Sequence, residues 1–248
     1  MFPGDKPFEL EVNLKYTFES RVRYSEIGKD GSMTIPSVIN YFQDCSTFQS
    51  EQLHVGLDYL KETGRIWMLN TWHIELKQPI PLGTDIRIST WAYKFDTVFG
   101  YRNFMICDNM DTVLAKADTK WVLYDVNQQS LVRIQAEDVA AYGEGQPLVM
   151  ELPSKKLRKP KAGEVIDSIT VPAYFIDTNG HMNNARYVEL ALEYLPVDME
   201  CSVIDVLYKQ QAVVGDVIRI MRTVQEDGVT VTLMGADETQ LHAIICFR

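Results

Sequence analysis

The stretch Gly83-Thr84-Asp85-Ile86-Arg87-Ile88 recurs later in the chain as Gly215-Asp216-Val217-Ile218-Arg219-Ile220. Upstream of each copy lies a strand-like segment, which is followed by a polar turn and then by a helix-like run. These three segments are residues 18–24, 26–32 and 35–49 in the first half of the chain, and residues 169–174, 177–181 and 182–195 in the second half. The same order of segments in both halves indicates a duplicated structural unit.

Within each unit, apolar and polar residues alternate with a period of two. Ile86 and Ile88 alternate with Arg87, and Val and Leu alternate with Thr across residues 229–233. This period predicts antiparallel strands with one apolar face and one polar face. One amphipathic helix buries the apolar face of such a sheet only if the sheet curls around it. We therefore expect an α+β fold, with two curled sheets that each wrap a central helix and that can join into one continuous sheet.

A basic segment separates the two units. We expect a first unit at residues 1–150, a linker at residues 151–163 and a second unit at residues 164–248. Pro153 and Pro160 disfavour regular structure in the linker. Its basic residues lie in a run without an acid, and they are Lys155, Lys156, Arg158, Lys159 and Lys161. The first unit is also longer than the second, and we place the insertion at residues 55–64.

Composition excludes several classes of protein. The chain has 248 residues, of which 46% are apolar, as expected for a packed globular protein. The 24 Lys and Arg against 34 Asp and Glu give a net charge of −10, which argues against general nucleic-acid binding. No apolar run reaches the ~18 residues that a membrane helix needs. The first residues lack the pattern of a signal or transit peptide, so we expect a cytoplasmic protein without a membrane partner.

The cysteines, histidines and tryptophans add little chemistry on their own. Four scattered cysteines without C-x-x-C spacing are expected to be reduced core residues. The histidines show no ligand spacing and no G-x-G-x-x-G occurs, so we predict neither a metal nor a dinucleotide cofactor. All four tryptophans lie in the first unit, either as ordinary core or as the lining of an apolar ligand pocket, and they are Trp67, Trp72, Trp91 and Trp121.

The polar turn of the second unit carries chemical groups. Asp177, Asn179 and His181 alternate just where a helix is expected to begin. Asp177 is suited to accept a proton or attack a carbonyl, His181 to carry a proton, and Asn179 to donate to an oxyanion. The alternative is structural, because Asp and Asn before a helix normally cap its first N–H groups. The equivalent turn at residues 26–32 has no histidine, so we expect one site per chain.

The run Asp177-Thr178-Asn179-Gly180-His181-Met182-Asn183-Asn184-Ala185-Arg186-Tyr187 strongly resembles the D-x-N-x-H-[VM]-N-N-x-[KR]-Y signature of the acyl-acyl-carrier-protein (acyl-ACP) thioesterases of plants and bacteria. The resemblance covers nearly the whole chain and implies a tandem hot-dog fold. It also implies a hydrolase of fatty acid biosynthesis, which cleaves the thioester between a fatty acyl chain and the phosphopantetheine arm of the carrier. By resemblance, Asp177, Asn179 and His181 are the catalytic residues.

The sequence departs from the family at a later strand, where a Y-[RK]-x-E-[C] pattern is usual. Here Gln211 stands at the position of the Glu and Ala212 at that of the Cys. A Cys/His/Asn mechanism is therefore excluded. Gln211 can hydrogen-bond a water or His181 but cannot act as a base, which leaves the base role to Asp177.

Four further questions stay open in the sequence. Glu189 and Glu193 on the predicted helix are either substitute acids or solvated residues. The basic linker either docks the acidic carrier protein or only keeps an exposed segment solvated. An acyl-coenzyme A thioesterase or hydratase of the same fold, or a non-catalytic acyl-binding protein, is the alternative function. Two fused units allow a monomer, and exposed sheet edges allow an oligomer.

Overall fold

The computed structural model describes residues 14–197, 199–237 and 239–248. In chain order the elements of the first half are β1 (Tyr16–Arg21), η1 (Tyr24–Glu26), α1 (Ile35–Gln52), α2 (Leu57–Thr63), β2 (Arg65–Leu76), β3 (Asp85–Phe95), β4 (Gly100–Asp108), β5 (Val113–Asp125), β6 (Ser130–Val132) and α3 (Ala136–Val139). The second half contributes β7 (Glu164–Thr170), η2 (Ala173–Phe175), α4 (Asn184–Leu192), β8 (Val203–Tyr208), β9 (Val217–Gln225), β10 (Gly228–Gly235) and β11 (Leu241–Phe247).

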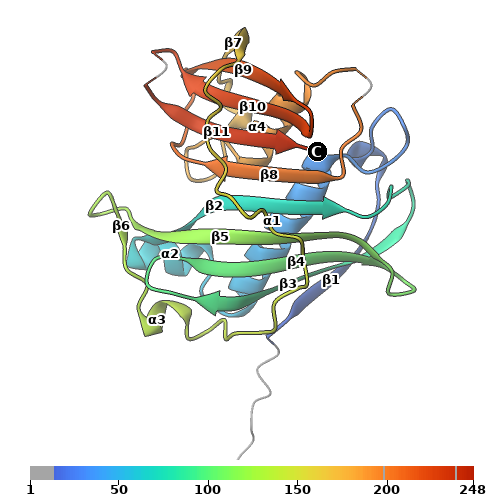
Figure 1. Ribbon diagram of the computed structural model, residues 1–248. Helices are drawn as coiled ribbons and strands as arrows, with labels where there is room; N and C mark the ends of the chain where they lie inside the picture. Colours follow the sequence, from blue (N-terminus) through green and yellow to red (C-terminus); the bar gives the residue numbers. More distant parts are fainter. Residues whose placement is uncertain (1–13, 198, 238) are drawn as a thin grey trace, which may run out of the picture.

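The strands of the described residues form one antiparallel 11-stranded sheet, in the order β1-β3-β4-β5-β2-β8-β11-β10-β9-β7 with β6 paired to β5. The halves meet where β2 pairs with β8, and Trp72 there lies opposite Val206. Figure 1 shows these two strands side by side, with α1 behind the lower half of the sheet and α4 behind the upper half. The predicted α+β architecture is therefore confirmed, and its two curled sheets are joined into one.

Helix α1 is the central helix of the first unit. The Thr34 side chain caps it by accepting from the Ser37 amide at 3.3 Å, and a proline lies in its first turn, where no amide partner is lost. Its apolar face is fully buried, and Phe42 packs against both Trp72 and Phe104. The helix ends at Gln52, three residues beyond the predicted end.

Helix α4 corrects the sequence prediction at both ends, because it covers Asn184–Leu192 rather than residues 182–195. Its N-cap is Asn183, whose side chain accepts from the Ala185 amide at 2.9 Å. Met182 precedes the cap and forms a β-bridge with Ile176. The capping interpretation of Asp177 and Asn179 is therefore wrong, because both residues belong to the turn that this bridge closes.

The extra length of the first unit forms helix α2, which lies inside the predicted insertion. The polar face of β10 is not exposed. Thr230 and Thr232 lie on this predicted polar face, but they are 3% and 0% exposed. The chain between the units crosses this side of the sheet, where the Thr223 hydroxyl donates to the Ala162 carbonyl. Both faces of β10 are buried.

We call residues 145–163 the strap, because they cross the sheet on the face opposite α1 without forming a helix or a strand. Figure 1 shows this yellow segment running from the lower unit to β7. Sheet residues fix it by hydrogen bonds, which are Trp91 Nε1 to the Gln146 carbonyl (2.7 Å), the Leu148 amide to Asn103 Oδ1 (2.8 Å), Lys116 Nζ to the Val149 carbonyl (2.7 Å) and the Glu151 amide to Glu75 Oε1 (3.2 Å). The strap is thus an ordered element.

Two further properties follow from the described residues. All four cysteines are free thiols, two of them buried and two half-buried. Among the helices of residues 14–248 outside the two gaps, none has the length and apolarity to cross a membrane.

Candidate functional site

The turn between η2 and α4 is closed by its own hydrogen bonds. The Asp177 amide donates to the His181 carbonyl at 2.8 Å, and the Gly180 amide donates to the Asp177 carbonyl at 3.1 Å. The Asp177 carboxylate also accepts from the Asn179 amide at 2.8 Å. Gly180 has φ +79°, which only glycine adopts without strain. These bonds fix the backbone of the turn that carries the three predicted catalytic residues, and they also hold the Asp177 carboxylate.

The first unit contains the same turn without the same chemistry. The Gly28 amide donates to the Ser32 carbonyl at 2.9 Å, and Gly31 has φ +77°. At the positions equivalent to the Asp, Asn and His of the second turn, this turn carries Gly28, Asp30 and Ser32. The duplicated backbone therefore carries the Asp/Asn/His set once, as the sequence predicted.

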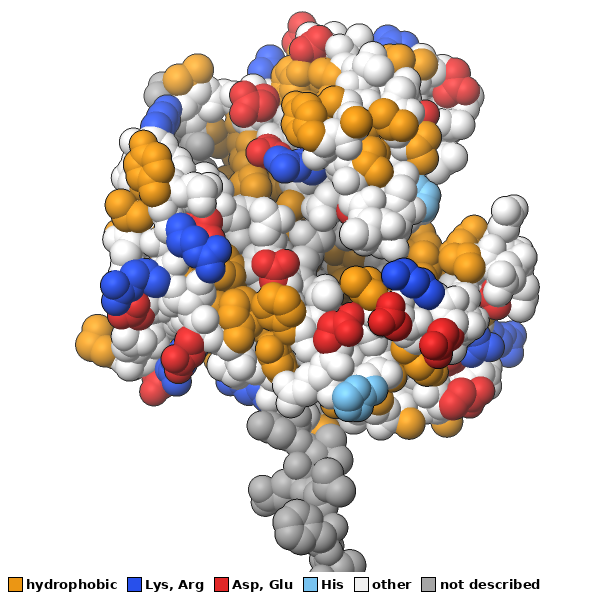
Figure 2. All heavy atoms as spheres, turned by 180° about the vertical axis from the view of Figure 1, so that it is seen from behind, with side chains coloured by type: hydrophobic (Ala, Val, Ile, Leu, Met, Phe, Trp, Pro, Cys, Tyr) orange, Lys and Arg blue, Asp and Glu red, His pale blue; other side chains and the backbone are white. Residues whose placement is uncertain are grey.

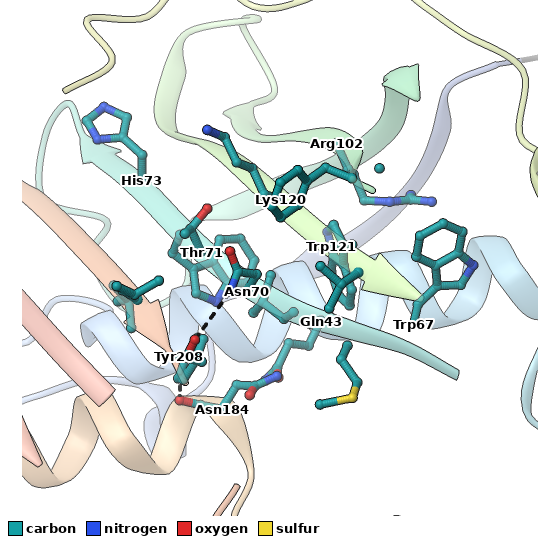
Figure 3. A pocket seen from close by; sticks show the side chains of 18 of the residues that line it. Gln43, Trp67, Asn70, Thr71, His73, Arg102, Lys120, Trp121, Asn184 and Tyr208 are labelled. Atoms are coloured by element: carbon teal, nitrogen blue, oxygen red, sulfur yellow. Dashed lines mark hydrogen bonds between the residues drawn. The ribbon is translucent and has the colours of Figure 1, made fainter. Parts of the chain in front are cut away.

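The four predicted site residues are Asp177, Asn179, His181 and Gln211, and they line one open cavity of ≈ 2100 Å³ between the units. The lining includes α1 on one side of the sheet and the strap on the other, so the cavity reaches both faces. The opposite wall comes from α1 of the first unit. Gln43 on that helix donates to Asn183 Oδ1 at 3.4 Å, which places α1 against the start of α4. Figure 3 shows Gln43 facing Asn184 and Tyr208 across the pocket, and Figure 2 shows apolar side chains in hollows between the two units. Both units build the site.

His181 has an unsatisfied polar atom. Its Nδ1 is buried and has no hydrogen-bond partner among the described residues. Leaving such a group unpaired costs about 1–3 kcal/mol, so a bound ligand or water that reaches this nitrogen gains that interaction. His181 thus lines the cavity with one ring nitrogen that no described side chain or backbone group engages.

Gln211 is held beside the turn by its neighbours. The Met182 amide donates to the Ala212 carbonyl at 2.8 Å, and the Ala212 amide donates to the Tyr187 hydroxyl at 2.9 Å. Ala212 is itself fully buried, whereas Gln211 is exposed to the cavity. Its amide is thus available to a ligand or a water.

The two other acids proposed from the sequence lie elsewhere. Glu189 pairs with Arg186 on the same helix at 2.5 Å, and Glu193 is exposed at the end of α4. Neither side chain lines the cavity. The solvated interpretation of both residues therefore fits the structure.

Four of the five basic linker residues line the cavity, and they are Lys155, Lys156, Arg158 and Lys159. Lys161 belongs to the same strap but does not reach the cavity. The four residues are exposed, and none of them has an ion-pair partner among the described residues. They form a positive rim on an acidic protein.

The tryptophans divide between the two sequence interpretations. Trp72 is 1% exposed and stacks in the core with Phe42, whereas Trp91 binds the strap. Trp67 and Trp121 line the cavity, together with Phe95 of β3. Part of the cavity therefore has aromatic walls supplied by the first unit.

Sequence reasoning missed the contribution of α1 and of strand β4. Gln43 and Arg102 both line the cavity but lie far from the signature in the chain. The only signal in the sequence is polarity, since both interrupt apolar patterns. For metals, the described residues contain no group of three or more His, Cys, Asp and Glu side chains that could hold an ion.

The family model for the acyl-ACP thioesterase N-terminal domain matches residues 13–142, and the model for the C-terminal domain matches residues 158–244. A chloroplastic acyl-[acyl-carrier-protein] hydrolase of Cuphea viscosissima is 23% identical over 250 residues, which are 95% of this chain and 58% of that protein. An oleoyl-acyl carrier protein thioesterase of Arabidopsis thaliana is 21% identical over 238 residues, which are 86% of this chain and 65% of that protein. The chain thus spans about three fifths of the length of these curated relatives.

Two solved structures share the whole fold. An acyl-ACP thioesterase from Bacteroides thetaiotaomicron superposes with a TM-score of 0.85 at 20% identity, over 95% of this chain and 97% of that chain. The 12:0-ACP thioesterase from Umbellularia californica gives a TM-score of 0.85 at 18% identity, over 95% and 96% of the two chains. The fold is therefore the hot-dog fold, present here in tandem.

Proposed function

The chain belongs to the acyl-ACP thioesterase family, and on this basis we propose that it hydrolyses fatty acyl-ACP thioesters to a free fatty acid and the carrier protein. The observation that carries the proposal is the rigid turn that presents Asp177, Asn179 and His181 to one cavity. We assign catalysis to the unit at residues 164–248 and acyl-chain binding to the unit at residues 1–150.

The proposed chemistry uses the turn and the strand beside it. Asp177 acts as the base that takes a proton from water, or as the nucleophile, at the thioester carbonyl. Asn179 donates to the developing oxyanion, an interaction worth about 2.7–4 kcal/mol. His181 carries the proton to the departing thiolate of phosphopantetheine. Gln211 orients the water, because an amide hydrogen-bonds water but is not a base.

The acyl chain extends from this turn along α1 into the first unit. Trp67, Trp121 and Phe95 supply apolar surface there. Each buried methylene contributes about 0.8 kcal/mol, so the length of the apolar channel ranks acyl chains. The positive rim of Lys155, Lys156, Arg158 and Lys159 receives the acidic carrier protein.

The test is the release of free thiol from a panel of acyl-ACP thioesters, from butyryl to palmitoyl. We expect wild type to hydrolyse at least one of them and Asp177→Asn to lose nearly all activity. The matched control is Asp30→Asn, which makes the same change in the equivalent turn of the first unit, and there we expect activity close to wild type. Thermal melting checks that both variants fold.

Three outcomes contradict the proposal. Faster hydrolysis of acyl-coenzyme A than of any acyl-ACP would make the protein an acyl-coenzyme A thioesterase. Stoichiometric acyl binding without thiol release makes the protein an acyl-binding protein, with Gln211 as the reason. An equal loss of activity in both Asp variants removes the catalytic role from Asp177.

A further inference from the structure

Arg102 on β4 is a buried cation inside the cavity. The side chain points to the α1 side of the sheet, and the residue is only 8% exposed. Its Nη1 donates to Thr90 Oγ1 at 3.2 Å and to Gln49 Oε1. Nε and Nη2 have no hydrogen-bond acceptor among the described residues. Two N–H groups on one edge of the guanidinium are therefore unused.

Among the described residues, no carboxylate forms an ion pair with this guanidinium. The guanidinium carbon lies 5.2 Å from the centre of the Tyr142 ring. Burial lowers the pKa of Arg102, and the groups that oppose this effect are Tyr142 and Cys45 rather than an acid. Because arginine stays protonated in proteins, a buried guanidinium without a counter-ion is costly unless a ligand pairs with it.

The position of Arg102 relates it to the substrate path. Gln43 of α1 contacts Asn183 near the catalytic turn, whereas Ser50 of the same helix lies 3.0 Å from the Tyr142 hydroxyl, beside Arg102. Seven residues of helix separate these two contacts, about 10 Å along its axis. The guanidinium is therefore at the far end of the channel from the thioester.

Aromatic rings connect the two ends of the channel. Trp67 contacts Phe95 at 6.2 Å between ring centres, and Phe95 contacts Tyr142 at 6.4 Å. In Figure 3 the Arg102 guanidinium lies on the same side of the pocket as Trp67, away from Asn184 and Tyr208. An acyl chain that follows these rings ends against a charged group rather than an apolar floor.

We propose that Arg102 binds a carboxylate at the distal end of the acyl chain, so that the preferred substrates are half-thioesters of dicarboxylic acids. The inference rests on the proposed thioesterase function and names its substrate class. Nε and Nη2 form the planar fork that takes the two oxygens of a carboxylate. The same pairing supplies the missing counter-ion, while the aromatic walls bury the methylenes between the two carbonyl carbons.

The first experiment compares acyl-ACP pairs of equal chain length that end either in a carboxylate or in a methyl group. We expect wild type to show kcat/KM about ten- to a hundredfold higher for the carboxylate-ended member of the best-fitting pair. Arg102→Gln is expected to abolish or reverse this preference. Butyryl-ACP is too short to reach Arg102, so its hydrolysis measures any general damage that Arg102→Gln does to the site, and the preference is normalised to it. A wild-type preference for the methyl-ended chain at every length overturns the proposal.

A second measurement separates this inference from the proposed reaction. Binding of free dicarboxylic and monocarboxylic acids of equal length is followed by the fluorescence of the cavity tryptophans, and it needs no turnover. Tighter binding of the dicarboxylic acid to wild type, lost in Arg102→Gln, supports the inference even if no thioester is cleaved. Equal binding overturns it, whatever the enzyme hydrolyses. If Arg102→Gln does not fold, Arg102→Lys keeps the charge, loses the fork and is expected to lower the preference.

Discussion

In the proposed mechanism, the identity of one residue, Gln211, determines how much of the base chemistry rests on Asp177. Both side chains line the cavity, and a glutamate at position 211 would add a second carboxylate beside the turn. We expect Gln211→Glu to raise kcat about tenfold, which is less than the roughly 10²- to 10⁴-fold of a positioned base, because Asp177 already supplies a carboxylate. Gln210→Glu is the matched control, since this neighbour is exposed and lines the same cavity. Equal effects of the two changes would show that added charge alone alters the rate.

Single residues were predictable from sequence where neighbours in the chain are also neighbours in space. Asp177, Asn179 and His181 occupy one turn that lines the cavity, so their spacing in the sequence was enough to predict a candidate site. The helix cap was assigned wrongly because Asp and Asn serve both in turns and at N-caps, and only the structure distinguishes Asn183. Arg102 reaches the cavity from another unit through tertiary packing, for which the sequence carries no local signal.

Among the elements, the pairing of β2 with β8 carries a buried charge network. His73 Nδ1 lies 2.7 Å from Asp205 Oδ1 on the opposite strand, and His73 Nε2 lies 3.4 Å from Glu75 Oε1. Burial alone would raise the pKa of Glu75, but Lys77 and Lys116 lower it to about 2. Burial would likewise lower the pKa of His73, but Asp205 and Glu75 outweigh it and raise that pKa. The network is thus most stable with a charged histidine.

This network predicts that the stability of the β2–β8 pairing depends on pH. A histidine whose folded pKa is raised contributes its full stability below about pH 6.5 and loses that contribution as the pH rises through the folded pKa. We expect the melting temperature of wild type to exceed that of His73→Gln most at about pH 6 and less at alkaline pH. His54→Asn changes an exposed histidine and is expected to show no such dependence. A difference that is constant with pH contradicts the role of His73.

The elements also show how far a period of two can be interpreted. Ile86 and Ile88 are buried as predicted, because they face the central helix. Thr230 and Thr232 are buried as well, although they lie on the predicted polar face. Alternation reports which residues face the helix, but it does not report that a strap covers the other face. Such a cover is a long-range contact between irregular chain and sheet.

On the scale of the whole molecule, duplication has produced two similar turns and one chemical site. The repeat at Gly83 and Gly215, together with the same order of strand, turn and helix before each copy, predicted two units. The join between β2 and β8 was open in the sequence, since the strand edges of both units have similar composition. Fusion allows the units to diverge, so that one turn keeps Asp177 and His181 while the other carries Gly28 and Ser32.

In the proposed function, the charge of the whole molecule gives the positive rim its role. A protein with a net charge of −10 repels an acidic carrier at long range, so productive docking needs a local patch of opposite sign. We expect Lys156→Glu to raise KM for acyl-ACP about fivefold at low ionic strength and less at high salt, because surface charges are screened. Lys161→Glu alters the net charge equally from the same strap but off the cavity, so its KM is expected to change little. Cleavage of acyl-pantetheine, which lacks the carrier, is expected to be unaffected by either change. Equal KM values for the two variants on acyl-ACP would show that the positive rim does not bind the carrier and only keeps the strap solvated.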